Sequence, residues 1–115
     1  MTDAISVFAA GLDSLGAGPG RRGPLIVYRV DVLAGQHAGQ AIETAVEAAE
    51  LASWPVAPPH WIHLPATVTF ARTNCQPSPI TGWLRHSRQV TGWGTDPDPA
   101  RAWLAHVRGV LAQAQ

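Results

Sequence analysis

Proline interrupts this sequence too often for a bundle of long helices. Ten prolines and eleven glycines are spread over 115 residues. A proline inside a helix removes a backbone donor and clashes with the preceding turn, and glycine raises the entropic cost of regular structure. The sequence therefore predicts short elements joined by many turns. Because a chain of this length suffices for one hydrophobic core, we expect a single domain over residues 1–115.

Composition restricts the partners and the compartment that we expect. Hydrophobic residues make up 46% of the chain and charged residues 14%, which argues against disorder. Eight basic and eight acidic residues cancel, so neither nucleic acid nor a membrane surface is an expected partner. The sequence shows no apolar run of membrane-spanning length and no basic leader, and its single cysteine has no internal disulfide partner. These features predict a cytoplasmic protein.

The N-terminal part combines a helix pattern with a glycine-rich segment. Apolar residues at helical spacing predict a short amphipathic helix over residues 3–15, with Thr2 or Asp3 as its N-cap. Residues 16–23, GAGPGRRG, contain too much glycine for regular structure. We expect them to form a flexible surface loop.

Two segments have the pattern of paired strands. Residues 24–33, PLIVYRVDVL, alternate apolar and polar side chains as a half-buried strand does, with Tyr28 on the apolar face and Arg29 on the other. Residues 34–40 supply a glycine-containing turn. Residues 41–51, AIETAVEAAEL, contain good helix formers, but their β-branched residues and the preceding strand and turn favour an antiparallel partner strand.

The middle of the chain is rich in proline. Residues 53–65, SWPVAPPHWIHLP, cannot be helical, because proline removes amide donors and forces the residues before it into extended conformations. Residues 61–70 are expected to form a third strand, broken at Pro65. Residues 71–99 have the composition of a long irregular segment, and long loops in small domains tend to carry function.

A well-delimited helix is predicted near the end of the sequence. Asp98 is a suitable N-cap, and Pro99 suits the first helical position. Trp103 and Val107 belong to an apolar stripe that continues to Ala114. Such a helix should cover one side of an antiparallel sheet. The expected fold class is therefore α+β.

The proline-rich segment also carries a family motif. WPVAPPHWI, residues 54–62, resembles the aromatic-Pro-x-x-Pro-Pro motif that leads into the third strand of the ubiquitin-conjugating enzyme superfamily. Cys75 follows in an irregular stretch, and Trp83 stands eight residues beyond it, as in the family pattern. The order of helix, strand meander, proline motif, cysteine loop and C-terminal helix is also that of the family.

A second motif narrows the resemblance. GWLRHSR, residues 82–88, followed by Trp93, is similar to a cluster in the bacterial branch called prokaryotic family E. The resemblance covers roughly residues 24–114 and implies a compact ubiquitin-conjugating-like fold, with an antiparallel β-meander packed against N- and C-terminal helices. The His-Pro-Asn tripeptide that precedes the cysteine in eukaryotic enzymes is absent, and only His63-Leu64-Pro65 and Asn74 offer fragments of it.

The resemblance implies a thioester carrier. A ubiquitin-like modifier arrives as a thioester, which a thiolate attacks efficiently, so Cys75 is the candidate acceptor. An amine then attacks the new thioester, and the developing oxyanion needs a fixed donor. The family uses an asparagine, and Asn74 is the nearest one here. Arg85, His86 or Arg88 could act instead, because neighbours on an extended backbone point apart.

The same resemblance implies the partners. They are a ubiquitin-like modifier, an activating enzyme and, in some such systems, a metalloprotease that removes the modifier. These systems are often linked to antiphage defence. No cofactor is expected. Two alternatives stay open: a catalytically inactive module that holds the modifier or the activating enzyme noncovalently, and a small structural subunit of unrelated function.

Each candidate residue also has a structural interpretation. Cys75 could be a buried inert thiol, but its polar, turn-prone neighbours favour exposure. His86 fits a general base and a structural hydrogen-bonding group equally well. Trp83, Arg85 and Arg88 are candidates for partner contact or for support of the oxyanion. Packing is the alternative for the tryptophan, and a solvated salt bridge is the alternative for the arginines.

Four residues suggest a zinc site. They are His60, His63, Cys75 and His86. Residues three apart on a strand face opposite sides, and closely paired ligands such as Cys-x-x-Cys are missing. We therefore expect no metal.

Overall fold

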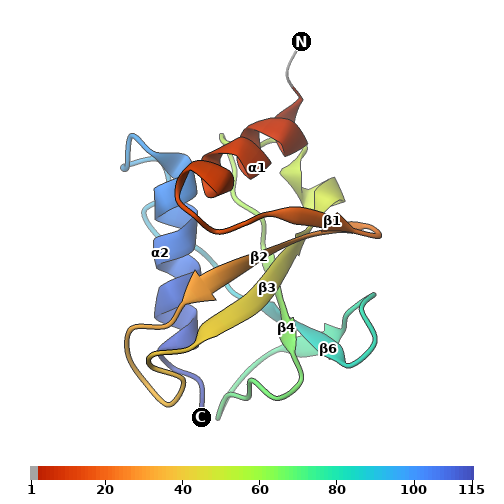
Figure 1. The fold of residues 1–115 in the computed structure, drawn as a ribbon, viewed down its shortest axis with the longest axis vertical. Coiled ribbons are helices and arrows are strands. Elements are labelled where there is room, and N and C mark those ends of the chain that lie inside the picture. The colour runs from red at the N-terminus through yellow and green to blue at the C-terminus, as the bar shows by residue number, and fades with distance from the viewer. Residues whose placement is uncertain (1–2) are drawn as a thin grey trace.

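An antiparallel sheet and two α-helices make up an α+β fold in the computed structural model, which describes residues 3–115 (Figure 1). In chain order, the elements are α1 (Ala4–Ser14), β1 (Gly20–Arg22), β2 (Leu25–Asp31), β3 (Ala41–Glu47), the 3-10 helix η1 (Ala48–Leu51), β4 (Trp61–Pro65), β5 (Cys75–Pro77), β6 (Trp83–Ser87) and α2 (Pro99–Leu111). The predicted α+β class with an antiparallel sheet is confirmed.

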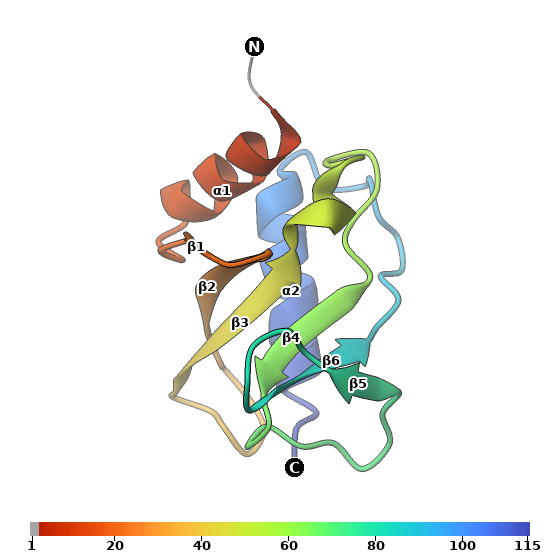
Figure 2. The same cartoon turned by 90° about the vertical axis from the view of Figure 1, so that its right-hand side faces the viewer.

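The order of the strands differs from their order in the chain. The sheet runs β1-β2-β3-β4-β6-β5, and every neighbouring pair is antiparallel. β5 precedes β6 in sequence but lies outside it, so β5 forms one edge of the sheet and β1 the other (Figure 2). The ladder between β3 and β4 is short, with Ala45 opposite His63 as its registered pair. The sheet therefore consists of two well-paired parts joined by a short ladder.

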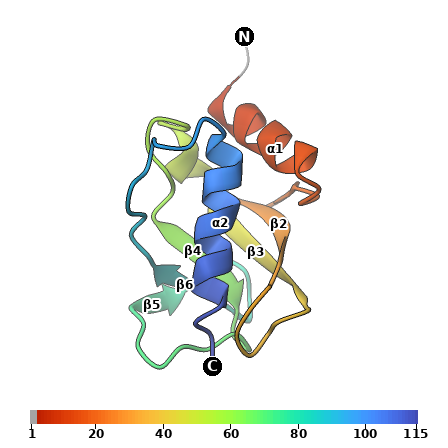
Figure 3. The same ribbon diagram turned by 90° about the vertical axis from the view of Figure 1, so that its left-hand side faces the viewer.

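The main core lies between the sheet and α2, which runs across one sheet face (Figure 3). Trp103 of α2 is fully buried, and its indole N–H donates to the Tyr28 hydroxyl at 2.6 Å. α1 approaches α2 at Gly11, where a Cβ would come within 2.8 Å of the Ala100 Cβ. The missing side chain therefore allows the close contact of the two helices. Along the described residues, no helix is both long and apolar enough to cross a bilayer.

Both helices and the first long strand pair follow the sequence prediction. The Asp3 carboxylate accepts from the Ser6 amide at 2.7 Å and caps α1, whereas Thr2 lies outside the described residues. Asp98 caps α2 in the same way at 3.2 Å, with Pro99 as its first residue. β2 and β3 share a seven-residue register. The helix formers at the end of segment 41–51 form only the short η1.

Segment 16–23 was expected to be a loop throughout, and this is wrong for residues 20–22. They form β1, which pairs with residues 25–27 of β2. Gly23, with a φ of +59°, lies in the turn that brings β1 beside β2. The amide and carbonyl groups of β1 and β2 form hydrogen bonds with each other. The prediction of a loop rested on the entropic cost of ordering a glycine-rich backbone, and the strand pairing outweighs that cost.

Segment 71–99 was expected to be irregular, and this is wrong for β5 and β6. These strands pair with each other, and β6 also pairs with β4 along five residues. Gly82, with a φ of +82°, lies in the turn between them. The GWLRHSR motif is therefore mostly a strand inside the sheet. Its strand partners are distant in sequence, so local composition does not reveal them.

The third strand is shorter than predicted. β4 ends at Pro65, and residues 66–70 form turns and irregular structure instead of a continuation of the strand. Val68 is buried and Phe70 packs against the same core from outside the sheet. Proline lacks the amide hydrogen that a continuing ladder needs, which explains why the strand stops there.

Candidate functional site

Cys75 is the first residue of the edge strand β5, and its side chain is exposed. It stands opposite His86 in the register of β5 and β6. Paired residues of an antiparallel ladder share one face, so Cys75 and His86 belong to the face that carries α2. Arg85 and Gln76 form the next pair and belong to the opposite face.

His86 is almost completely buried, with 1% of its surface exposed. Its Nδ1 lies 2.7 Å from the Thr73 hydroxyl, and its ring meets Phe70 edge-on. Burial, and after it the charge of Arg88, lowers the pKa of His86 below the ordinary value for histidine. The imidazole is therefore neutral at pH 7 and links β6 to the segment that leads into β5. This geometry fits the structural interpretation of His86.

Arg88 strengthens the same link. Its guanidinium donates to the Thr73 hydroxyl at 3.2 Å and to the Ser87 carbonyl at 3.0 Å, and it lies 4.8 Å from the centre of the Phe70 ring. Thr73 is two residues before Cys75. Arg88 and His86 together therefore fix the backbone just before the exposed thiol.

Asn74 is held through its backbone. Its carbonyl accepts from the Ser87 amide at 2.8 Å, which continues the pairing of β5 with β6 by one residue. The residue itself is exposed, as is Cys75 beside it. An exposed amide and an exposed thiol thus follow each other at the sheet edge.

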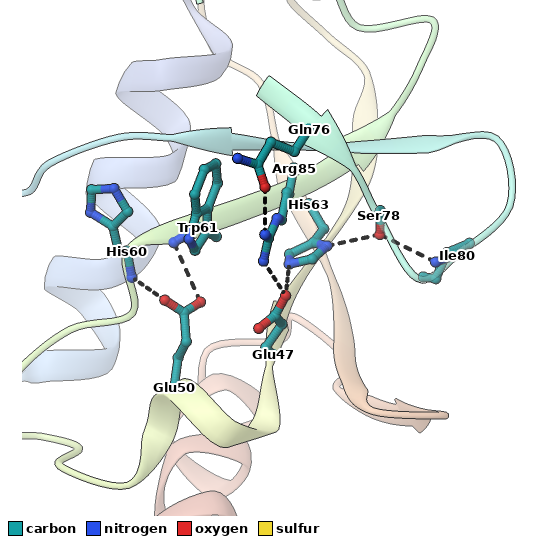
Figure 4. Close-up of polar contacts among 9 residues, drawn as sticks. All are labelled: Glu47, Glu50, His60, Trp61, His63, Gln76, Ser78, Ile80 and Arg85. Carbon is teal, nitrogen blue, oxygen red and sulfur yellow. Dashed lines mark hydrogen bonds and ion pairs between the residues drawn. The ribbon is translucent and has the colours of Figure 1, made fainter. Parts of the chain in front are cut away.

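Arg85 lies on the opposite face, where the contacts are polar (Figure 4). Its guanidinium donates to Glu47 at 2.9 Å and to the Gln76 side chain at 2.6 Å. It also lies 4.4 Å from the centre of the Trp61 ring. This network connects β3, β4, β5 and β6.

Trp83 also belongs to the face away from α2. It is half-buried and packs against a small cluster that comprises Leu25, Ala45 and Ile80, and Arg22 lies 5.9 Å from the centre of its ring. The residues of the GWLRHSR motif thus divide between the two sides of the sheet, with His86 on one and Trp83 and Arg85 on the other. The structure brings Asn74, Cys75, His86 and Arg88 near one edge but separates Trp83 and Arg85 from them.

His63 lies on the face away from α2 and is fully buried. Its Nδ1 lies 2.8 Å from the Ser78 hydroxyl, and its Nε2 lies 3.4 Å from a Glu47 oxygen. Burial lowers the pKa of His63, and the Arg85 charge lowers it further, while Glu47 opposes both. The three side chains form a continuous row in Figure 4.

Sequence reasoning missed several of these contacts. Glu47 and Ser78 were not singled out, nor was Thr73. The period-two pattern of segment 41–51 places Glu47 on the polar face of its strand, so this residue carried a usable signal. The positions of Ser78 and Thr73 depend on the β5–β6 hairpin, which the composition of segment 71–99 did not indicate.

The candidate zinc ligands do not form a cluster. His63 belongs to the face away from α2, whereas Cys75 and His86 belong to the other. His60 is exposed and bonds to the Ser87 hydroxyl. Within residues 3–115, no three His, Cys, Asp or Glu side chains lie close enough together to hold a metal ion.

Comparisons with known protein families, with curated proteins and with solved structures found no match to this chain.

Proposed function

We propose that this chain is a ubiquitin-conjugating-like carrier that accepts a ubiquitin-like modifier as a thioester on Cys75 and transfers it to an amine. The observation that carries the proposal is the exposure of Cys75 at the free edge of β5. A carrier thiol must be reachable by the tail of one protein and then by the amine of another. An edge strand offers access from the side that has no neighbouring strand.

The order of the elements supports a compact ubiquitin-conjugating-like fold. An N-terminal helix precedes the meander β2-β3-β4, and the proline motif follows β3 and leads into the start of β4. The cysteine and a C-terminal helix follow. Together with WPVAPPHWI and GWLRHSR, this order supports a place in the bacterial branch named above.

The proposed chemistry consists of two acyl transfers. The Cys75 sulfur attacks the carbonyl carbon of the activated modifier, a new carbon–sulfur bond forms, and the thiol of the activating enzyme leaves. An amine then attacks the same carbon, an amide forms, and Cys75 regains its thiol. The exposed Asn74 amide is the candidate donor to the oxyanion of this second step.

A reconstituted reaction tests the proposal. The protein is incubated with ATP and with an activating enzyme and a modifier encoded beside its gene, and adducts are separated with and without a reducing thiol. We expect one thiol-sensitive adduct in the parent and in Ser53→Ala, a control at an exposed serine. Cys75→Ser should give a thiol-resistant ester, and Cys75→Ala should give no adduct. An adduct of unchanged yield in Cys75→Ala would remove the catalytic assignment.

A noncovalent binding module is the second candidate. The observation in its favour is His86, which faces the same side as Cys75 but is buried and bonded to Thr73, so it is poorly placed as a base. A module should bind the modifier or the activating enzyme equally well as parent and as Cys75→Ala, and it should form no adduct. Calorimetric titration of both proteins distinguishes the two candidates.

A further inference from the structure

Ser78, His63 and Glu47 form a row of polar side chains outside the Cys75 site (Figure 4). The serine hydroxyl lies 2.8 Å from one ring nitrogen of His63, and the other ring nitrogen lies 3.4 Å from the Glu47 carboxylate. The residues come from the turn after β5, from β4 and from β3. A hydroxyl, an imidazole and a carboxylate in this order are the parts of an activated serine nucleophile.

The surrounding hydrogen bonds fix the hydroxyl in place. The Ile80 amide donates to the Ser78 hydroxyl oxygen at 3.2 Å, and the Ser78 amide donates to the Trp83 carbonyl at 3.2 Å. When Nε2 of His63 carries the ring proton, Nδ1 has a lone pair directed at the serine proton. Nε2 lies beside Glu47 without a hydrogen bond to it, so Glu47 acts on the ring through its charge.

The electrostatic setting favours a neutral imidazole that can take up a proton. Burial and the neighbouring Arg85 lower the pKa of His63, so the ring is unprotonated at pH 7. Arg85 also holds the Glu47 carboxylate at 2.9 Å, beside the ring that becomes an imidazolium when it accepts the proton. Glu47 acts here as a positioning residue.

We propose that Ser78 is a nucleophile for short-chain carboxylic esters, with His63 as its general base. A depression of about 290 Å³ adjoins the turn that carries Ser78 and is lined by Arg22, Gly23, Pro24, Pro79, Ile80 and Thr81. Its proline and isoleucine walls suit a small apolar acyl group. This activity is independent of the function proposed for Cys75.

The proposed reaction is an ordinary ester hydrolysis. A bond forms between the Ser78 oxygen and the carbonyl carbon, the serine proton passes to Nδ1 of His63, and the leaving alcohol takes that proton as its bond to carbon breaks. Water then attacks the acyl-serine and gives a proton to His63. The carboxylic acid leaves, and Ser78 recovers its hydrogen.

Two reagents test the proposal in the Cys75→Ala protein, which lacks the thiol that could also react. They are p-nitrophenyl acetate, followed by release of nitrophenol, and a fluorophosphonate, followed by intact and peptide mass spectrometry. We expect one phosphonate per chain, on Ser78, and no label in Ser78→Ala. Ser53→Ala, at an exposed serine elsewhere in the chain, should react like the parent. His63→Gln should slow acylation about 100-fold.

The pH profile separates a catalytic role from a structural one. Acylation should rise with pH through the lowered pKa of His63. The charged or titratable groups that influence this pKa are Glu47 and Arg85 on the same face of the sheet and His86 on the other face. Glu47 raises that pKa, so Glu47→Gln should move the midpoint to lower pH and should also slow the reaction. An acylation rate that does not vary with the protonation of His63 would show that this histidine has only a structural role.

Three results would each overturn the proposal: no labelling of the Cys75→Ala protein, a label on another residue, or undiminished labelling of Ser78→Ala. His63 is buried, so the folding of His63→Gln is checked by circular dichroism. If that variant unfolds, Ser78→Ala and the partly exposed Glu47→Gln still decide the outcome. Neither reagent involves the modifier, and failure here leaves the carrier proposal standing.

Discussion

His63 and His86 are buried, and His106 of α2 is partly buried. Burial is the main cause that lowers the pKa of each one below the ordinary value of 6.5. The charge of Arg88 adds to the effect for His86 and His106. Each ring is therefore neutral in the folded protein under conditions where it begins to be protonated in the unfolded chain.

This difference predicts a loss of stability in mild acid. Between the lowered folded pKa values and the ordinary unfolded value, the unfolded chain binds more protons, so the free energy of unfolding falls as the pH falls below about 6.5. Above that pH, the stability that these neutral histidines contribute is fully present. Thermal melting between pH 5 and pH 8 measures it, and His86→Gln should reduce the slope on the acidic side. A melting temperature that rises towards pH 5 would contradict this account.

The buried hydrogen bond from Trp103 to Tyr28 should contribute measurably to the stability of the fold. Tyr28→Phe removes the acceptor and leaves the indole N–H of Trp103 unsatisfied in the core. An unsatisfied buried donor costs about 1–3 kcal/mol, so the free energy of unfolding should fall by that amount in urea titration. Trp103→Phe in the Tyr28→Phe background is the control, because the double variant has no stranded donor. Equal stability of the parent and Tyr28→Phe would show that the bond contributes nothing.

At the level of elements, β5 is held from two sides. Its backbone pairs with β6 over three residues, and Gln76 accepts from Arg85 at 2.6 Å on the face away from α2. On the other face, Thr73 is bonded to His86 and Arg88 just before the strand begins. A three-residue edge strand has few hydrogen bonds of its own, so these side chains contribute much of its order.

Arg85→Ala should therefore loosen β5 without unfolding the sheet. The variant removes a partly buried ion pair with Glu47 and the hydrogen bond to Gln76, and we expect a global cost of about 1 kcal/mol. Amide hydrogen exchange should become faster in β5 and in its partner β6. The opposite edge strand β1 is the internal control, because it pairs with β2 and not with the strand that carries Arg85. Uniform acceleration across all strands would indicate a global effect instead.

For the whole molecule, the sequence predicted those elements whose pattern is local. The two helices carry their own caps at Asp3 and Asp98, and β2 shows its period-two alternation without reference to other strands. The exposure of Cys75 was also expected from its polar neighbours, and the structure has it exposed. Each of these features is determined by residues a few positions apart.

The remaining features depend on contacts between distant segments. β1 forms because β2 offers a free edge, and the strand in GWLRHSR forms because β4 and β5 lie beside it. Since side chains alternate along a strand, placing this motif in a strand separates Arg85 from His86, whereas a loop would have left them together. The row of Ser78, His63 and Glu47 joins three elements and has no counterpart in local sequence.

The carrier function requires a freely accessible Cys75, and the reaction of this cysteine with a thiol reagent measures its accessibility. Ellman's reagent is added to the native protein and to the protein in denaturant, and released thiolate is followed by absorbance. We predict one equivalent from the native chain at a rate comparable to that of the unfolded chain, and none from Cys75→Ala. A native thiol that reacts only after denaturation would contradict both the exposed edge position and the carrier function built on it.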